Sequence, residues 1–157
     1  MYEIWYLWLI FRKRSCIICG EFDKEIIIMK KLAVKKNEKC MACLQCVQAC
    51  SEAFYKEFNT DLSCIQIVAG KNGEAKPMVC IECGKCMKAC QHGAITQNPK
   101  TGVYMINKKL CVGCGECVAV CPMKVMVQKE GGPVSKCIAC GICVKACPME
   151  VLEIVEK

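Results

Sequence analysis

Short stretches in which apolar and polar residues alternate recur along the chain from residue 31 onward. The clearest are residues 65–68, 94–96, 103–106 and 125–127. Each lies near a turn signal of Gly, Asn or Pro, such as Asn72-Gly73. Alternation over a few residues is typical of short strands, and these residue types favour the turns between them. The pattern therefore predicts a series of small β-hairpins.

The two ends of this region carry strand-like segments as well. Residues 151–155 could pair with residues 31–34, which would tie the ends of the region together. We recognise no long amphipathic helical pattern and expect only single helical turns, such as residues 118–120. The predicted fold class is α+β, with short hairpins and short helices.

Residues 1–28 differ from the rest of the chain. Residues 4–11 form an apolar run that is too short to span a membrane, and three basic residues follow it at 12–14. A secretory signal would carry its positive charges before the apolar run and a small-residue cleavage site after it, and residues 1–28 show neither feature. We expect residues 1–28 to be an extension outside the functional domain, with a short interfacial anchor as the alternative.

The cysteine content changes the picture, because 19 of the 157 residues are Cys. Such a density is typical of a disulfide scaffold or of a metal protein. The odd number, the lack of a secretory signal and the spacing of two residues between most cysteines all count against disulfides. Metal ligation requires free thiolates, so we expect a reducing, cytoplasmic compartment.

One spacing, Cys-x2-Cys-x2-Cys-x3-Cys, occurs four times and accounts for sixteen of the cysteines. The first run is Cys40, Cys43, Cys46 and Cys50, and the second is Cys80, Cys83, Cys86 and Cys90. The third run is Cys111, Cys114, Cys117 and Cys121, and the fourth is Cys137, Cys140, Cys143 and Cys147. A repeated unit of this kind predicts repeated sites of the same chemistry.

This spacing suits iron–sulfur chemistry. Three thiols two residues apart in one tight loop can reach three corners of a cubane [4Fe-4S] cluster, and the fourth corner needs a cysteine from elsewhere. Zinc sites more often combine two Cys-x2-Cys pairs across a longer loop, often with histidine, whereas this chain has one His. The spacing therefore indicates iron as the metal, with zinc as the remote alternative.

Residues 111–122 and 137–148, each with a proline after the fourth cysteine, resemble the cluster-binding runs of bacterial-type ferredoxins. With four runs, residues 31–157 more closely resemble the four-cluster ferredoxin-like subunits that accompany anaerobic oxidoreductases. These enzymes are carbon monoxide dehydrogenases, hydrogenases, formate dehydrogenases and related molybdenum or tungsten enzymes of the aldehyde oxidoreductase type. Ser51 and Gln91 replace the proline in the first two runs, a departure that leaves the ligands intact.

The resemblance implies tandem ferredoxin-like units that hold four [4Fe-4S] clusters. Runs two and three would form an inner unit, about 77–128, and runs one and four an outer unit, about 31–55 plus 134–157. The implied ligand sets are Cys80, Cys83, Cys86 with Cys121; Cys111, Cys114, Cys117 with Cys90; Cys40, Cys43, Cys46 with Cys147; and Cys137, Cys140, Cys143 with Cys50. The rival pairing, run one with two and run three with four, stays open because the spacer lengths do not exclude it.

The formal charge of +7 is counted with every cysteine neutral. A four-thiolate [4Fe-4S] cluster carries roughly −2 when oxidised, so four clusters would bring the net charge to about −1. We therefore expect no nucleic-acid partner. Lysines such as Lys35, Lys36, Lys39, Lys85 and Lys88 are first of all a solvated surface, and steering of an acidic partner is the second interpretation.

The function that these features predict is electron transfer. The sequence has no Gly-x-Gly-x-x-Gly loop, no P-loop and no Cys-x3-Cys-x2-Cys run, so we expect a carrier that is not catalytic alone. The resemblance implies the electron-relay subunit of an anaerobic oxidoreductase, with a catalytic subunit of one of the enzyme types named above as partner. A freely diffusing polyferredoxin is the alternative, and a zinc-binding module is the remote one.

A few other residues could carry chemistry. Cys64 is expected to be a small buried thiol, with a replacement ligand or redox sensor as the alternative. Cys16 and Cys19 form a lone Cys-x2-Cys pair without partners, and His92 is expected in an exposed loop. The aromatic residues Phe54, Tyr55 and Phe58 are expected to cover clusters, with partner docking as the second interpretation.

Overall fold

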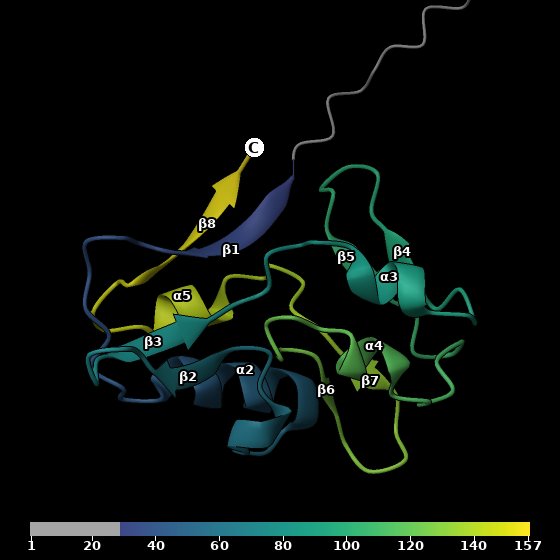
Figure 1. Ribbon diagram of the computed structural model, residues 1–157, viewed down its shortest axis with the longest axis horizontal. Coiled ribbons are helices and arrows are strands. Elements are labelled where there is room, and N and C mark those ends of the chain that lie inside the picture. Colours follow the sequence, from purple (N-terminus) through teal and green to yellow (C-terminus); the bar gives the residue numbers. More distant parts are fainter. Residues whose placement is uncertain (1–28) are drawn as a thin grey trace, which may run out of the picture.

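The computed structural model describes residues 29–157, so the predicted extension, with Cys16 and Cys19, lies outside the described residues. The described part is a small mixed helix-and-strand fold with short hairpins (Figure 1). Among residues 29–157, no helix has the length and apolar character needed to cross a membrane.

Three β-hairpins follow one another along the chain, and each is a separate two-stranded antiparallel sheet. They are β2 (Gln66–Ala69) with β3 (Ala75–Met78), β4 (Ile95–Gln97) with β5 (Tyr104–Ile106), and β6 (Val127–Gln128) with β7 (Val134–Ser135). In the first hairpin the Gly70 N–H donates to the Glu74 carbonyl at 2.7 Å and closes the turn. The hairpins predicted from the alternating pattern are confirmed.

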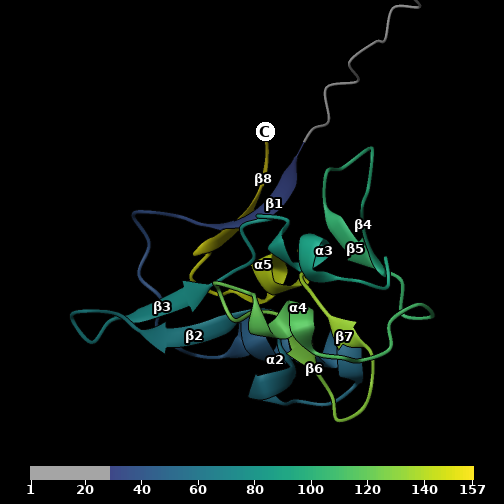
Figure 2. The same cartoon turned by 45° about the vertical axis from the view of Figure 1, so that its right-hand side comes forward.

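The first and last strands pair with each other. β1 (Lys30–Val34) lies antiparallel to β8 (Leu152–Glu156), from Lys30 opposite Glu156 to Val34 opposite Leu152. The two strands lie side by side in both views (Figures 1 and 2). Leu32 and Leu152 are buried in the same core cluster, so this sheet is anchored by apolar packing as well as by its ladder. The predicted pairing of residues 151–155 with 31–34 is confirmed.

Each cysteine run leads into a helix. Three of these helices are single turns, as predicted: α3 (Lys85–Ala89), α4 (Glu116–Ala119) and α5 (Ile142–Ala146). After each of them the fourth cysteine starts a turn, in which Gly93, Lys124 or Glu150 donates its N–H to the carbonyl of that cysteine. All three turn residues have positive φ.

The prediction of a single helical turn was wrong for the first run, because α2 (Gln45–Tyr55) has 11 residues. Ser51 occupies the position at which runs three and four carry proline, so its backbone N–H allows the helix to continue, although α3 ends at Ala89 in run two, where Gln91 also replaces proline. The Ser51 side chain is buried, donates to the Glu57 carbonyl at 2.6 Å and accepts from the Asn59 N–H at 2.9 Å. These bonds hold the next segment, which includes the short 3-10 helix η1 (Thr60–Leu62), against α2.

Apolar side chains gather in two core clusters. One contains Leu32, Val47, Ile65 and Leu152, and the other contains Ile95, Met126 and Val134, and cysteines of the runs belong to both. Helix α2 packs against α5, and α3 packs against α4. Run one therefore meets run four, and run two meets run three.

Candidate metal centres

The four cysteine loops share one backbone conformation. In each loop, two residues with positive φ flank the second cysteine, one directly before it and one directly after it. These are Ala42 and Leu44, Glu82 and Gly84, Gly113 and Gly115, and Ala139 and Gly141, with φ between 52° and 80°. Left-handed residues alternating with right-handed ones turn successive N–H groups toward one side, which makes a concavity suited to anions and iron–sulfur sites. In keeping with this, the N–H groups of Ala42 and Ala139 point at the Sγ atoms of Cys40 and Cys137, each at 3.5 Å.

Four residues hold this conformation at a cost. Ala42, Leu44, Glu82 and Ala139 are not glycine, and a left-handed residue with a side chain is strained by about 1–3 kcal/mol. Strain of this kind persists where the surrounding structure requires it and concentrates at functional sites. The four loops share one backbone shape although their residues differ, which indicates that this shape is required at the site.

Burial of the thiols repeats from loop to loop. The second cysteine is exposed in every run, and the third is buried in every run: Cys43, Cys83, Cys114 and Cys140 are exposed, and Cys46, Cys86, Cys117 and Cys143 are buried. The fourth cysteines, Cys50, Cys90, Cys121 and Cys147, are half-buried. Each loop therefore presents one thiol to the surface and one to the core.

Three cavities of similar size are each lined by three thiols of one run and a fourth from another. The Cys80 cavity is lined by Cys80, Cys83, Cys86 and Cys121; the Cys111 cavity by Cys111, Cys114, Cys117 and Cys90; and the Cys137 cavity by Cys137, Cys140, Cys143 and Cys50. Apart from the thiols, most of the lining is apolar side chains and loop backbone.

Of the remaining four thiols, Cys46 and Cys147 belong to runs whose helices, α2 and α5, pack against each other. Burial, then the neighbouring Cys147, and further Cys40 and Cys43 raise the pKa of Cys46 to about 11. Cys147, from run four, thus lies close enough to Cys46 of run one to interact with it electrostatically. Twelve of the sixteen run cysteines therefore line shared cavities, and each of these cavities joins two runs.

The donor set fits an iron–sulfur cluster. Nowhere in residues 29–157 do three Cys, His, Asp or Glu side chains converge so as to hold a metal ion. In each of the three cavities, instead, four run cysteines line a shared space, as a cubane with one iron at each corner requires, and Cys64 is a fifth thiol in the Cys137 cavity. The soft thiolate donors and the near absence of oxygen and imidazole ligands suit iron–sulfur clusters.

Burial works against ionisation of these thiols. It raises the pKa of Cys80 and Cys143 to about 12 and that of Cys117 and Cys137 to about 11, with neighbouring negative charges as a further cause. Bound iron is cationic and would offset both the cost of burial and the effect of the negative charges, because ligation requires thiolates and releases their protons. We therefore expect cluster binding to be coupled to proton release and to folding.

Cys50 is an exception because Cys64 lies beside it. The Cys64 side chain is 1% exposed and lines the Cys137 cavity together with Cys50. Its hydrogen bond to Cys50 is the main reason that the pKa of Cys50 falls to about 6, with burial opposing and Ser63 assisting. The expected burial of Cys64 is confirmed. Its contact with a run cysteine was missed, because no sequence pattern links residues 50 and 64.

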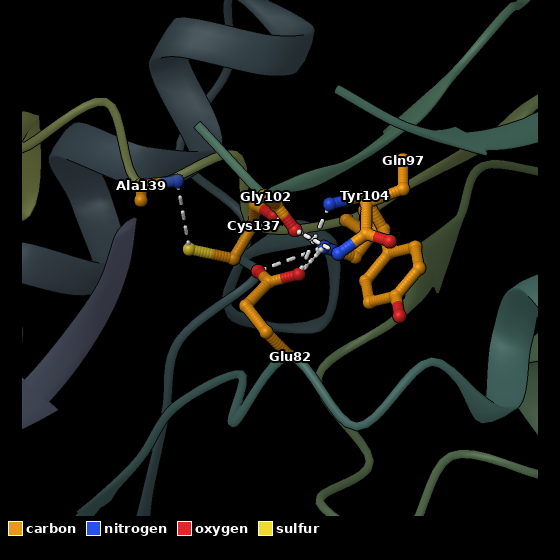
Figure 3. Close-up of polar contacts among 7 residues, drawn as sticks. Glu82, Gln97, Gly102, Tyr104, Cys137 and Ala139 are labelled. Carbon is orange, nitrogen blue, oxygen red and sulfur yellow. Dashed lines mark hydrogen bonds and ion pairs between the residues drawn. The ribbon is translucent and has the colours of Figure 1, made fainter. Parts of the chain in front are cut away.

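A buried ion pair between Lys136 and Glu82 also escaped the sequence analysis. Figure 3 labels Glu82 and two residues near it, Tyr104 and Cys137. Lys136 Nζ lies 2.9 Å from each carboxylate oxygen of Glu82 and donates to the Cys137 carbonyl at 2.8 Å. Glu82 also accepts from the Tyr104 N–H at 3.2 Å. Burial acts to lower the pKa of Lys136, but negative charge at Cys80 and Glu82 raises it overall, so this lysine is charged. A signal was present, since the other three loops carry Ala or Gly where Glu82 stands.

The other predicted residues lie near the cavities to different degrees. His92 is exposed, as expected, and it lines the Cys111 cavity. Phe54 lines the Cys137 cavity, and the hydroxyl of Tyr55 is hydrogen-bonded to Ser135 Oγ at 3.0 Å. Phe58 is exposed.

Comparisons with known families agree with the donor set. A 4Fe-4S dicluster domain family matches residues 79–125, a second 4Fe-4S dicluster domain family matches residues 103–148, and a 4Fe-4S binding domain family matches residues 37–55. The two dicluster matches overlap on run three and join it to run two in one case and to run four in the other. No curated protein matches the chain. The matched segments contain all sixteen run cysteines, and they support a ferredoxin-like iron–sulfur protein, an electron carrier that binds multiple [4Fe-4S] clusters.

Proposed function

We propose that the chain binds four [4Fe-4S] clusters and relays single electrons for a separate catalytic subunit of an anaerobic oxidoreductase. The observation that carries this proposal is the repeated lining of a cavity by three thiols of one run and one of another. A bound [4Fe-4S] cluster gains and loses one electron at a time. The chain contributes the thiolates, the inward-facing N–H groups and an apolar lining that keeps water away.

The ligand sets that we propose are the crosswise ones. Runs two and three exchange their fourth cysteines, Cys90 and Cys121, and runs one and four exchange Cys50 and Cys147. The packing of α3 on α4 and of α2 on α5, together with the β1–β8 pairing, supports this arrangement over the rival one. It divides the chain into an inner unit, about 77–128, and an outer unit, about 31–55 plus 134–157.

The pairing can be tested by counting iron in variants. If Cys40 and Cys147 share one cluster, the double variant Cys40→Ala/Cys147→Ala should lose no more iron than the more damaging of the two single variants. If run one instead pairs with run two, the two substitutions damage different clusters and their iron losses add. The matched control is Cys40→Ala/Cys121→Ala, whose losses should add under the crosswise pairing.

A basic groove beside run one is the surface we propose for the partner. Cys40 and Met41 line it together with five lysines: Lys35, Lys36, Lys39, Lys71 and Lys76. Two acidic residues, Glu38 and Glu74, also line it, and Glu74 is paired with Lys39 at 3.0 Å. The groove is therefore net basic, and Met41, 61% exposed, offers an apolar contact next to a cysteine loop. An acidic redox partner fits such a surface.

The relay role is tested by purifying the full chain anaerobically from its native cytoplasm. Co-purification with one large catalytic subunit, and its reduction by the dithionite-reduced chain, is the expected result. A monomer that exchanges electrons equally well with several unrelated enzymes would overturn the dedicated-subunit role. That outcome would favour a freely diffusing polyferredoxin, the second candidate, for which an open and exposed docking groove is equally suitable.

A further inference from the structure

Only two charged residues are buried within the described part of the chain, and they contact each other. Glu82 is 7% exposed and Lys136 is 2% exposed. Their contact joins residues 54 positions apart, one within the loop of run two and the other directly before run four. The pair therefore connects the proposed inner unit to the proposed outer unit.

The position of the pair relates it to two cluster sites. Both side chains line the Cys80 cavity, where Tyr104 lies beside them and the Lys136 ammonium is 5.9 Å from the centre of its ring. The same ammonium donates to the carbonyl of Cys137, whose thiol lines the Cys137 cavity. The charge of Lys136 thus lies in the wall between an inner site and an outer site.

Stability alone does not account for this pair. Removing two charges from water is costly, and apolar replacements of similar volume are often as stable or more stable. A fixed charge in a dry region has another effect, because it changes the energy of adding an electron to a site nearby. Positive charge favours the reduced, more negative state, and negative charge disfavours it.

We propose that Lys136 and Glu82 together set the reduction potential of the Cys80 site relative to the other sites. The difference in potential then determines whether electron transfer is favourable from the inner unit to the outer unit or in the opposite direction. Lys136 stabilises an electron on the Cys80 site, and Glu82 offsets part of that effect. The inference rests on the proposed function, since it requires a cluster in that cavity. It goes beyond it by assigning the control of one site to two residues that are not ligands.

The experiment is a redox titration of the anaerobic, fully loaded chain, followed by electron paramagnetic resonance. In Lys136→Met the reduction potential of one cluster should fall by at least about 59 mV, which corresponds to a tenfold change in the one-electron equilibrium constant. In Glu82→Gln the same cluster should shift upward, and Glu82→Gln/Lys136→Met should lie between the two single variants. Lys136→Arg keeps the charge and should restore the wild-type potential.

An exposed ion pair of the same length supplies the matched control. Lys129 Nζ lies 2.8 Å from Glu57 Oε1, but these side chains are 56% and 43% exposed. Water screens exposed charges, so Lys129→Met should leave every potential unchanged. A shift in this control equal to that in Lys136→Met would overturn the assignment.

A purely structural role gives a different pattern. Both single variants would then lose iron or stability, and the loaded fraction would keep the wild-type potentials or shift in one common direction; either result overturns the proposal. If Lys136→Met does not bind its clusters, Glu82→Gln provides the test, because glutamine can still accept hydrogen bonds from Lys136 and from Tyr104. An upward shift of the reduction potential in Glu82→Gln supports the proposal. An unchanged potential, or failure to bind the clusters, overturns it. Wild-type protein without a cluster at this site would instead refute the proposed function.

Discussion

The region around runs two and three and the region around runs one and four use the same loop but close it differently. Residues 77–128 are continuous in sequence, with two short helices and the β4–β5 hairpin between them. Residues 31–55 and 134–157 come from opposite ends of the described chain and meet through β1, β8 and the longer helix α2. The inner region is therefore built mainly from local contacts, apart from Val134 in its core and the Glu82–Lys136 pair, and the outer region depends on contacts across nearly the whole described chain.

This difference bears on how each region is stabilised. Closing a long loop costs more conformational entropy than closing a short one, although the cost grows slowly with length. The outer region offsets this with a five-residue antiparallel ladder and the larger core cluster. We infer that the inner region can keep its clusters without the outer one, whereas the outer region depends on the inner one to bring its halves together.

The largest effect is expected from a charge buried in either core. Leu32→Asp places a carboxylate in the β1–β8 sheet, where an unpaired charge costs several kcal/mol, and iron should fall from about sixteen to about eight per chain. Ile95→Asp makes the same change in the inner core and should remove nearly all of the iron. Metal analysis of the purified variants checks this, and equal losses in the two variants would contradict the dependence of the outer region on the inner one.

The next effect concerns one loop position in the two regions. Gly113 has φ of +72°, and a Cβ there would lie 2.9 Å from the Gly132 carbonyl oxygen, so Gly113→Ala should destabilise the loaded chain by about 1–3 kcal/mol. Ala139 has the same place in run four with φ of +52°, and Ala139→Gly should be neutral or stabilising by up to about 1 kcal/mol. Anaerobic guanidinium unfolding measures both, and the same sign for the two substitutions would refute the shared loop geometry.

A smaller effect is expected on the rate of reduction, and it distinguishes the basic groove beside run one from the lysines of α3. Lys36→Glu/Lys71→Glu should slow reduction by the anionic reductant dithionite at least tenfold at low salt, or about 1.4 kcal/mol in activation free energy. The difference should vanish at high salt. Lys85→Glu/Lys88→Glu on α3 is the control, and an equal slowing there would mean that the groove has no special part in electron entry.

The smallest effect tests a contact that only the outer region has. Cys64→Ala removes the hydrogen bond to Cys50, and the potential of the Cys137 site should fall slightly while the iron content stays the same. Cys64→Ser keeps a donor and should leave that potential closer to wild type. Loss of about four irons per chain in Cys64→Ala would make Cys64 a ligand and contradict its role as a donor to Cys50.

The sequence was informative wherever the structure depends on local pattern. Hairpins, the β1–β8 pairing and the short helices α3, α4 and α5 followed from alternation, turn residues and cysteine spacing. The length of α2 was missed, and Ser51 in place of proline was an ambiguous signal, because Gln91 stands at the same place in run two and α3 stays short. The contacts of Cys64 with Cys50 and of Glu82 with Lys136 could not be foreseen, because each depends on how separate segments pack and no periodic pattern records that.

The central claim is that the sixteen run cysteines build four cubane clusters, and metal analysis of the anaerobically purified full chain tests it most directly. Iron and acid-labile sulfide are measured per chain, and electron paramagnetic resonance is recorded after dithionite reduction. The account predicts about sixteen of each, with signals from interacting reduced clusters. Zinc in place of iron, or iron near eight per chain in fully loaded protein, would contradict it.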